Sequence, residues 1–525
     1  MLSFFASMML YAKQRNYFIN KDAKERIDNA QQKKQVSKEM NSFNYRFVLK
    51  TIGFLLIIES LFMMISSVVA FSSHEICGDA MLMSSAITFF SGIFFRLIGT
   101  DDYEKPIGKR ESFLMVALAW VVMSAFGMLP FYLSGIIPDI SNAYFETMSG
   151  FTTTGSTILT DIGSIPKGLL FWRSITQWIG GIGIIVFALA VLPMLGGNAS
   201  VLYDAETTGI SHERFRPRVT QVAKRLWITY VTVTGILFIL LILGPMNAFD
   251  AICHAMTTMS TGGYSTKQES IAYWNSPYLE YVLSIFMFIG GVNFSLIFFL
   301  LRGIPKKLFK DEEFRWYGII CLIFIFIIAL CLLFSGQLSN IEYAFRTSLF
   351  QVTSVITTTG FATVDYMNWG AFYSLIICLL MLFCACAGST SGGIKIVRII
   401  ILFKNAINEF KRQVHPNAIL PVRLNGHVVP IDAVTKVLAF LFLYLAIMII
   451  SFLVLSFMGM GFEESVGSAI SCMGNVGPGL GAVGPSGHFN DIPIPAKWYL
   501  CFIMLTGRLE LFTVLSLFMP AFWRR

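Results

Sequence analysis

The segment Ile356-Thr357-Thr358-Thr359-Gly360-Phe361-Ala362-Thr363 carries hydroxyl side chains around a glycine, although it lies late in a strongly apolar chain. Related polar segments occur three more times, as F-T-T-T-G-S at 151–156, M-S-T-G-G-Y at 259–264 and G-N-V-G-P-G at 474–479. Their motif glycines, at 155, 262, 360 and 477, are separated by 107, 98 and 117 residues. A segment that recurs with such a period indicates an internal repeat. We therefore predict four equivalent loops that form the quarters of one ion-selective pore.

The composition is typical of a polytopic membrane protein. Hydrophobic residues make up 55% of the 525 positions and charged residues only 13%, whereas soluble domains carry about a quarter charged residues. Of the 39 Lys and Arg residues, 33 fall in segments that we assign to the cytoplasm and five on the opposite side. The positive-inside rule then places both termini on the cytoplasmic side of the plasma (inner) membrane. The net charge of +8 needs no nucleic-acid partner to explain it.

Motifs for covalent chemistry are missing from the sequence. The chain contains no G-x-x-x-x-G-K-[ST] segment and no H-E-x-x-H segment, so we expect neither an intrinsic ATPase nor a zinc peptidase. His254 is the one candidate base near the polar loops, and the sequence gives it no evident partner. We therefore do not expect an enzyme.

From residue 111 onward, one pattern repeats: a span, a short amphipathic segment, a polar loop and a second span. The short segments cover 141–151, 248–259, 341–357 and 463–474, and the second spans cover 168–195, 278–302, 369–403 and 495–523. A helix needs about 20 residues to cross a hydrocarbon core, so the short segments must enter and return on one side. Irregular backbone at that depth is tolerated only where it is buried in protein or lines water. The four short helices therefore predict one shared polar cavity.

The predicted fold is an all-α membrane protein of about ten spans, with two extra N-terminal spans at 49–71 and 80–98. We expect helix caps at Ser141 or Asn142, Asn247, Asn340 and Glu463. Residues 1–48 form a cytoplasmic N-terminal extension without a cleaved signal peptide. The remaining predicted units are 49–110 for the extra spans, 111–200 for pore repeat 1, 201–303 for repeat 2, 304–405 for repeat 3 with a broken second helix, and 406–525 for repeat 4.

The polar loops suit a cation. Each short helix delivers its C-terminal end, which carries about half a negative charge, to its loop. Backbone carbonyls and Thr hydroxyls can replace the water around a cation, and glycine takes cheaply the backbone angles that turn successive carbonyls inward. The predicted filter residues, which would bind the transported ion, are Thr153, Thr154, Gly155, Ser260, Thr261, Gly262, Thr358, Thr359, Gly360, Asn475, Val476 and Gly477.

The second span of the third repeat contains a run of small residues that disfavours a continuous helix, because each glycine costs about 1 kcal/mol relative to alanine. We predict a broken helix whose loop lies across the pore as a gate. Arg508 falls near the middle of the last span, where an unpaired guanidinium costs at least about 2.5 kcal/mol. We expect it to bond the free carbonyls of the gate loop. The predicted gate residues are Gly388, Ser389, Thr390, Ser391, Gly392, Gly393 and Arg508.

Two alternatives remain open at this point. Glu59 lies within the first span, and an acid at membrane depth is either functional or paired inside the protein. A secondary transporter that couples ion uptake to H⁺ or Na⁺ would also use broken helices and an intramembrane acid. Dependence of uptake on a proton or sodium gradient distinguishes the coupled transporter from a channel-like pore.

The loops at 150–157, 259–265, 357–365 and 474–481 resemble those of the Trk/Ktr/HKT superfamily of potassium transporters, and within it the TrkH/TrkG type. Supporting stretches are W-R at 172–173, Q-W-I-G-G at 177–181, G-G-V-N-F at 290–294, G-S-T-S-G-G-I-K at 388–395 and G-R-L-E at 507–510. The similarity runs from about residue 45 to the C-terminus. The two extra leading spans resemble the TrkH type more than the shorter KtrB type.

This resemblance implies a single-chain pore of four pseudo-repeats that pairs as a homodimer in the membrane lipid. It also implies a cytoplasmic, nucleotide-binding regulatory subunit of the TrkA or KtrA type, for which the basic loops 196–225 and 395–436 are the expected docking surface. K⁺ is the implied transported ion, with no organic cofactor. In the plant relatives a serine at the first filter glycine goes with sodium permeation, so Gly155 implies potassium selectivity.

Overall fold

The computed structural model describes residues 43–99, 109–191 and 219–523, and within these ranges the regular secondary structure is almost entirely helical. Most of the predicted N-terminal extension and most of the basic loop 196–225 lie outside the described residues. The strands in the described part are β1 (Arg423–Leu424) and β2 (His427–Val428), which form one antiparallel hairpin. The prediction of an all-α fold is confirmed.

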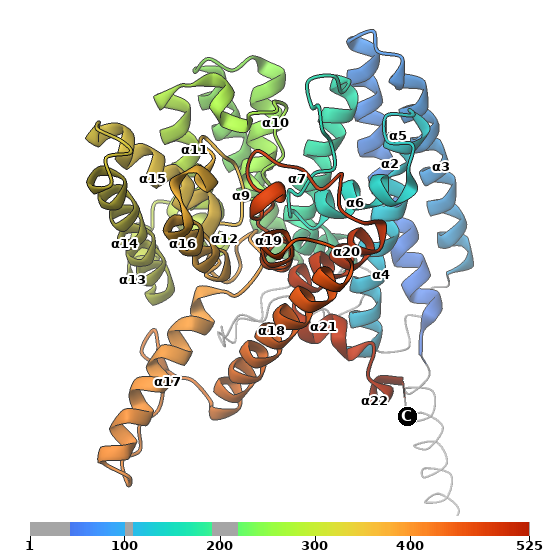
Figure 1. The fold of residues 1–525 in the computed structure, drawn as a ribbon. Coiled ribbons are helices and arrows are strands. Elements are labelled where there is room, and N and C mark those ends of the chain that lie inside the picture. Colours follow the sequence, from blue (N-terminus) through green and yellow to red (C-terminus); the bar gives the residue numbers. More distant parts are fainter. Residues whose placement is uncertain (1–42, 100–108, 192–218, 524–525) are drawn as a thin grey trace, which may run out of the picture.

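Two long helices precede the repeated part. These are α2 (Tyr45–Ser72) and α3 (Cys77–Ile98), which pack against each other along their length and against the first unit through α2 (Figure 1). The first unit then contains α4 (Lys109–Gly127), α5 (Leu129–Leu133), α6 (Ile140–Phe151) and α7 (Lys167–Val191). The second unit contains α9 (Val219–Ile242), α10 (Ala248–Met259), the short 3-10 helix η2 (Ser270–Trp274), α11 (Pro277–Gly290) and α12 (Phe294–Leu301).

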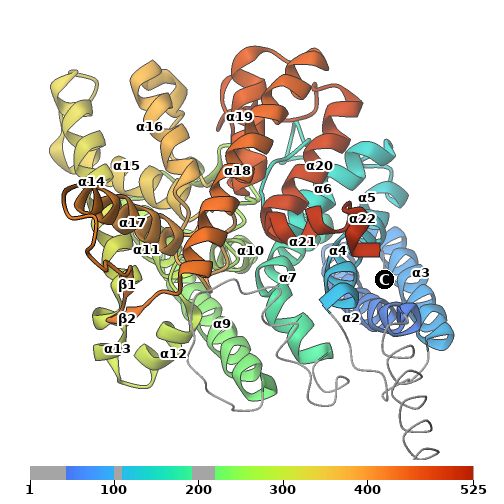
Figure 2. The same cartoon turned by 90° about the horizontal axis from the view of Figure 1, so that it is seen from below.

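The third unit contains α13 (Pro305–Lys310), α14 (Glu312–Phe334), α15 (Ile341–Ile356), η3 (Tyr366–Trp369), α16 (Ala371–Leu382) and α17 (Ile396–Val414). The fourth contains the β1–β2 hairpin, α18 (Ile431–Phe457), α19 (Phe462–Gly474), η4 (Gly481–Val483), α20 (Ile494–Arg508), α21 (Leu511–Ser516) and α22 (Pro520–Trp523). Asn425 of the hairpin accepts a hydrogen bond from the Glu312 amide, which ties the hairpin to the start of α14 (Figure 2). Helix α17 projects from the bundle at one end (Figure 1).

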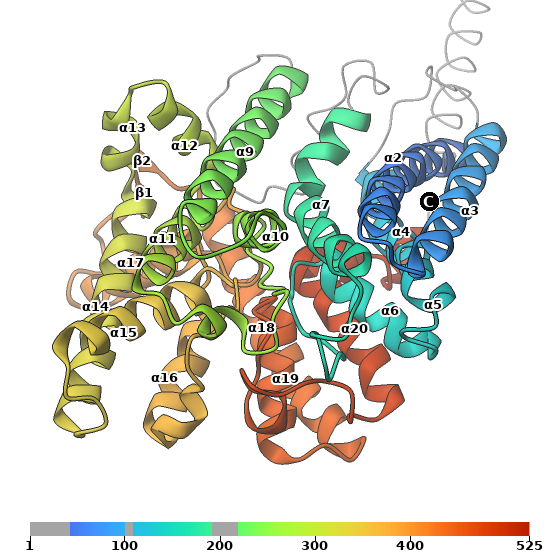
Figure 3. The same cartoon turned by 90° about the horizontal axis from the view of Figure 1, so that it is seen from above.

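Six of the described helices are long and apolar enough to cross a membrane, namely α2, α3, the α4–α5 stretch, α9, α14 and α18. The four short helices α6, α10, α15 and α19 lie among the units around a common centre when the molecule is viewed from above (Figure 3). They are buried in protein: every residue of α6 from Ala143 to Phe151 is shielded. This is the environment that irregular backbone at membrane depth requires.

The short helices begin where the sequence suggests, with two corrections to the caps. Asn247 and Asn340 accept backbone N–H groups of α10 and α15 as predicted. The cap of α6 is Asp139, which accepts the amide of Asn142, so neither Ser141 nor Asn142 is the cap. At α19 the cap is Gly461, and Glu463 lies inside the first turn, where its charge suits the helix N-terminus.

Three of the predicted second spans are broken: the one at 369–403, as predicted, and two that were expected to be continuous. The span predicted at 278–302 bends by 113° between α11 and α12. The span predicted at 495–523 ends at Arg508 and resumes as α21 after Glu510, whose φ is +60°. Arg508 therefore lies at a helix end, where it can reach carbonyls of other helices.

Candidate functional site

Each short helix ends in the same backbone motif. The residues Thr153, Thr261, Thr358 and Asn475 all have a left-handed conformation, with φ between 53° and 59°. The following amide donates back to a carbonyl in the last helical turn at 2.8–2.9 Å, and the four pairs are Thr154 to Ser149, Gly262 to Thr257, Thr359 to Ser354 and Val476 to Ser471. This arrangement is a Schellman motif, which satisfies part of the helix end and lets the chain turn away.

The residue after this turn is a glycine with positive φ in all four loops. A Cβ added to any of these glycines would lie no more than 2.7 Å from a carbonyl oxygen of another loop. The added Cβ of Gly155 would meet the Gly262 carbonyl, that of Gly263 the Thr359 carbonyl, that of Gly360 the Val476 carbonyl and that of Gly477 the Thr154 carbonyl. The four loops thus meet in one closed cycle, unit 1 to 2 to 3 to 4 and back to 1.

This cycle corrects the predicted second loop by one residue. Gly263, with φ of +77°, is the equivalent of Gly155, Gly360 and Gly477, whereas Gly262 occupies the position of Thr154 and its counterparts. The predicted set Ser260, Thr261 and Gly262 is therefore shifted, and the equivalent set is Thr261, Gly262 and Gly263. The sequence Thr-Gly-Gly leaves two glycines to choose from, and only the backbone angles separate them.

Hydroxyl pairs support the first and third loops from within. The Thr152 and Thr154 hydroxyls lie 2.8 Å apart, and those of Thr357 and Thr359 lie 2.7 Å apart. In the fourth loop the Asn475 side-chain amide donates to the Thr154 hydroxyl at 2.8 Å. The predicted residues Thr153, Thr358 and Val476 complete the same buried cluster. The structure thus brings the predicted filter residues of all four loops together.

The segment 383–395 between α16 and α17 is irregular and contacts three of the loops. The Thr261 hydroxyl donates to that of Thr390 at 3.2 Å, and the Gly392 amide donates to the Thr358 hydroxyl at 3.3 Å. Gly392 also packs directly against the side chain of Asn475. Gly388, Ser389, Ser391 and Gly393 belong to the same segment, and the Ser389 and Ser391 hydroxyls lie 2.8 Å apart.

Arg508 ties this segment to the first unit. Its guanidinium donates to the carbonyl of Thr390 and, at 2.7 Å, to the carbonyl of Gly180 on α7. The expectation that Arg508 bonds carbonyls of the broken helix agrees with this contact. Glu510 pairs with Arg398 at 2.5 Å, which links the break after α20 to α17.

Glu59 and His254 have different surroundings from those expected. Glu59 is fully buried on α2, next to Gly127 and Phe151, and its carboxylate oxygens accept no hydrogen bond from the described residues. Of the two alternatives for Glu59, internal pairing is therefore not seen in the described part of the chain. His254 does have partners: its ring nitrogens lie 2.7 Å from the Asp250 carbonyl and 3.0 Å from the Ser265 hydroxyl.

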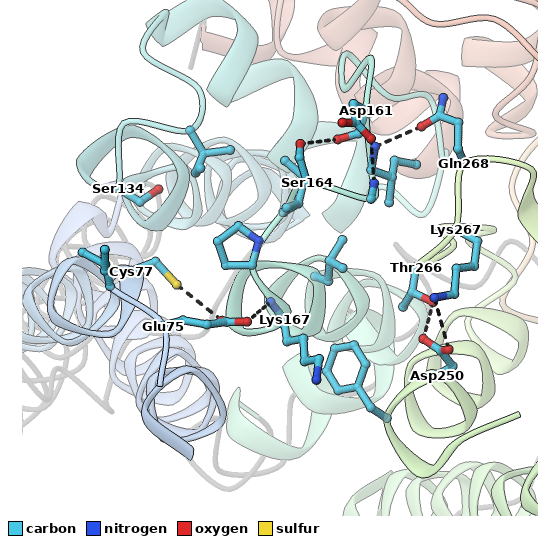
Figure 4. A pocket seen from close by; sticks show the side chains of 18 of the residues that line it. Glu75, Cys77, Ser134, Asp161, Ser164, Lys167, Asp250, Thr266, Lys267 and Gln268 are labelled. Carbon is cyan, nitrogen blue, oxygen red and sulfur yellow. Dashed lines mark hydrogen bonds and ion pairs between the residues drawn. The ribbon is translucent and has the colours of Figure 1, made fainter. Parts of the chain in front are cut away.

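A cavity of about 1150 Å³ lies beside the second loop, between the α2–α3 turn, residues 161–167, the start of α10 and residues 266–269 (Figure 4). Its lining includes none of the four loops that form the cycle. On its wall Asp250 accepts the Thr266 hydroxyl at 2.6 Å and pairs with Lys267 at 3.7 Å. These contacts hold the stretch that follows the second loop rather than forming an empty charged site.

Comparison with known proteins gives the same family from three directions. A family model described as a cation transport protein, TrkH, matches residues 84–525. The Trk system potassium uptake protein TrkH of Escherichia coli (strain K12) is 37% identical over 486 residues, which cover 92% of this chain and all of that protein. The TrkG protein of the same strain is 35% identical over 494 residues, with coverage of 92% and 100%.

A solved structure agrees with these sequence relatives. The crystal structure of the potassium transporter TrkH from Vibrio parahaemolyticus superposes with a TM-score of 0.84 at 33% sequence identity. The match covers 92% of this chain and 100% of that one. The chain therefore belongs to the TrkH family of cation transport proteins.

Proposed function

We propose that this protein takes up potassium ions across the inner (plasma) membrane through one gated, K⁺-selective pore. The observation that carries the proposal is the closed cycle in which each filter glycine approaches a carbonyl of another loop. Carbonyl oxygens arranged in this way can replace the hydration shell of a cation. The names of the relatives, which are potassium uptake proteins, support potassium as the ion.

In the proposed mechanism, K⁺ is the cargo and the chain performs no covalent chemistry. The ion enters among Thr153, Thr154 and Gly155 and the corresponding residues of the other loops, with Gly263 in place of Ser260 in the second loop. The C-terminal ends of the four short helices favour positive charge at the centre. Backbone carbonyls held by Schellman turns need little rearrangement to receive the ion, which keeps passage fast.

The segment 383–395 is the proposed gate. It touches three of the four loops through Thr390 and Gly392, and Arg508 holds it against α7. Opening the path requires the segment to move and the Arg508 bonds to break. A regulatory subunit can supply that free energy by binding more tightly to the open state.

The wider assembly is part of this proposal. The distribution of Lys and Arg supports cytoplasmic termini, and α17 with the β1–β2 hairpin then projects into the cytoplasm. This exposed basic surface suits a nucleotide-binding regulatory subunit of the TrkA type. A homodimer in the membrane completes the proposed complex.

The test is cation flux into proteoliposomes that contain this chain, with K⁺, Rb⁺ and Na⁺ compared side by side. We expect K⁺ and Rb⁺ flux well above Na⁺ flux, and loss of that preference in Gly360→Ser. Uptake that requires an imposed proton or sodium gradient would show that the protein is a coupled transporter and not a channel-like pore. Equal flux of all three ions in the unmodified protein would refute potassium selectivity. Addition of the regulatory subunit provides the opened state if the chain alone conducts weakly.

A further inference from the structure

The second filter loop is supported differently from the first and third. The first and third loops each carry a pair of bonded threonine hydroxyls, Thr152 with Thr154 and Thr357 with Thr359. In the second loop the matching positions are Ser260 and Gly262, so the second member of the pair has no side chain. The space is filled from outside: a Cβ on Gly262 would overlap the side-chain amide of Gln177, which comes from α7 of the first unit.

Gln177 holds the second loop on both sides of Gly263. Its amide nitrogen donates to the Gly262 carbonyl at 2.6 Å, and its amide oxygen accepts the backbone N–H of Tyr264 at 3.0 Å. The side chain is 0% exposed, so water does not compete for these bonds. Because one partner is an acceptor and the other a donor, the orientation of the amide is fixed by the network. The Gly262 carbonyl is one of the four in the cycle of loops.

One helical turn earlier on α7, Arg173 ties the stretch after the second loop to the stretch after the first. Its guanidinium donates to the Glu146 carboxylate at 2.7 Å, to the Ser265 carbonyl at 3.1 Å and to the Thr157 hydroxyl at 3.2 Å. It also lies over the Tyr264 ring, 3.8 Å from the centroid. The Arg173 side chain is 2% exposed, and Glu146 is fully shielded.

The Glu146 carboxylate of this pair also accepts hydrogen bonds from the end of the first loop and the residue after it. Glu146 accepts the Ile158 amide at 2.9 Å and the Thr157 hydroxyl at 3.1 Å. The Tyr264 hydroxyl closes the network by donating to the Glu146 carbonyl at 2.7 Å. A buried ion pair survives when its remaining donors and acceptors are satisfied, and here the satisfying groups are the Thr157 hydroxyl and the backbone of Ile158 and Ser265.

A second buried pair, between the second and third units, shows that burial alone does not produce this arrangement. Arg346 pairs with Glu280 at 2.6 Å and with Glu342 at 2.9 Å, and it is also shielded from solvent. Its bonded partners lie on α11 and α15, away from the filter loop of the third unit. Arg173 differs because its partners include the chain on either side of the pore loops.

We propose that Gln177 and Arg173 are positioning residues that hold the Gly262 carbonyl in the cycle and thereby set how well the pore distinguishes K⁺ from Na⁺. This inference rests on the proposed function. Discrimination between the two ions depends on the spacing and field strength of the coordinating oxygens. The second loop, which lacks its own hydroxyl pair, depends for that spacing on α7.

The experiment compares Gln177→Met and Arg173→Lys with the matched controls Gln351→Met and Arg346→Lys. Gln351 is likewise a buried amide, but it donates to the Val364 carbonyl, which lies past Gly360 and is not one of the four carbonyls of the cycle. The readout is the ratio of K⁺ to Na⁺ flux in proteoliposomes, which does not depend on how many pores have folded. Loss of one such hydrogen bond corresponds to a five- to tenfold change, so we expect the ratio to fall by about that factor in both α7 variants.

Each outcome has a defined meaning. A lower ratio in the α7 variants with an unchanged ratio in both controls supports the proposal, and partial recovery in Gln177→Glu, which keeps the acceptor for Tyr264, strengthens it. An unchanged flux ratio in the α7 variants overturns the proposal. A loss of all flux in these variants, or an equal fall of the ratio in the controls, also overturns it, because a general structural role of Gln177 and Arg173 would then explain the result. If the unmodified protein does not prefer K⁺ and Gly360→Ser changes nothing, the proposed function fails instead.

Discussion

At the scale of single residues, the decisive feature is a backbone angle. Gly263 has φ of +77°, and a Cβ there would overlap the Thr359 carbonyl, which as backbone cannot rotate away. We expect Gly263→Ala to abolish the K⁺ preference, since the left-handed angle alone costs a non-glycine residue about 1–2 kcal/mol. The measurement is the K⁺ to Na⁺ flux ratio.

The neighbouring glycine provides the comparison for this prediction. At Gly262 the added Cβ meets the Gln177 side chain, and φ there is not in the left-handed region, so Gly262→Ala should have a smaller effect. Gly235 on α9 is exposed with open space around it, and Gly235→Ala should leave flux unchanged. A larger effect at Gly262 than at Gly263 would contradict the register of the second loop.

The sequence predicted the composition of these loops better than their register. The positions of Thr358, Thr359 and Gly360 could be predicted because the first and third loops each contain a single glycine after a run of threonines, which leaves only one possible alignment. In the second loop, two successive glycines satisfy the same pattern, and only Gly263 has the left-handed backbone angle. The Gly262 carbonyl is held by Gln177, a residue 85 positions earlier in the chain. A contact of that kind has no local signal.

At the scale of elements, the broken helix of the third unit is held by Glu313 at the start of α14. One carboxylate oxygen of Glu313 accepts the Ala387 amide at 2.7 Å and the Val397 amide at 3.2 Å. Glu313→Ala leaves the Ala387 and Val397 N–H groups without this acceptor, and we expect a loss of about 2 kcal/mol in stability. Thermal unfolding and amide hydrogen exchange across 387–397 measure it. Glu409→Ala, which removes an exposed ion pair on α17, should stay within about 0.5 kcal/mol.

Arg508 tests the same element from the opposite side. Arg508→Gln removes the charge that holds the Thr390 and Gly180 carbonyls together, and charge-assisted bonds contribute about 1.5–3 kcal/mol each. We expect K⁺ flux of the chain alone to rise by about tenfold, because the closed state of the proposed gate loses stability. Arg302→Gln, at an exposed arginine over the Phe298 ring, is the control. Unchanged flux in Arg508→Gln would show that Arg508 does not stabilise the closed state of the proposed gate.

Short helices were predictable because their length is incompatible with a span, whereas two of the helix breaks were not. The break between α11 and α12 lies inside a stretch that is apolar on both sides. It is stabilised by backbone bonds to the segment 383–395, in which the Cys386 amide donates to the Gly291 carbonyl and the Phe294 amide to the Gly388 carbonyl. The free energy that pays for the bend comes from another element, so hydropathy along the chain does not reveal it.

At the scale of the whole molecule, four distant segments place carbonyl dipoles in one cycle, and those dipoles repel one another unless a cation lies between them. A bound cation of the right size should therefore stabilise the entire fold, since binding to the native state alone adds about 2.7 kcal/mol when the ligand is at a hundred times its Kd. We expect the unfolding temperature in detergent to be higher in K⁺ than in Na⁺ at equal ionic strength. In Gly263→Ala the difference should vanish, because the oxygens no longer form a matched site, while Gly235→Ala should retain it. Equal unfolding temperatures in the two salts for the unmodified protein would mean that the four loops do not act together as one cation site.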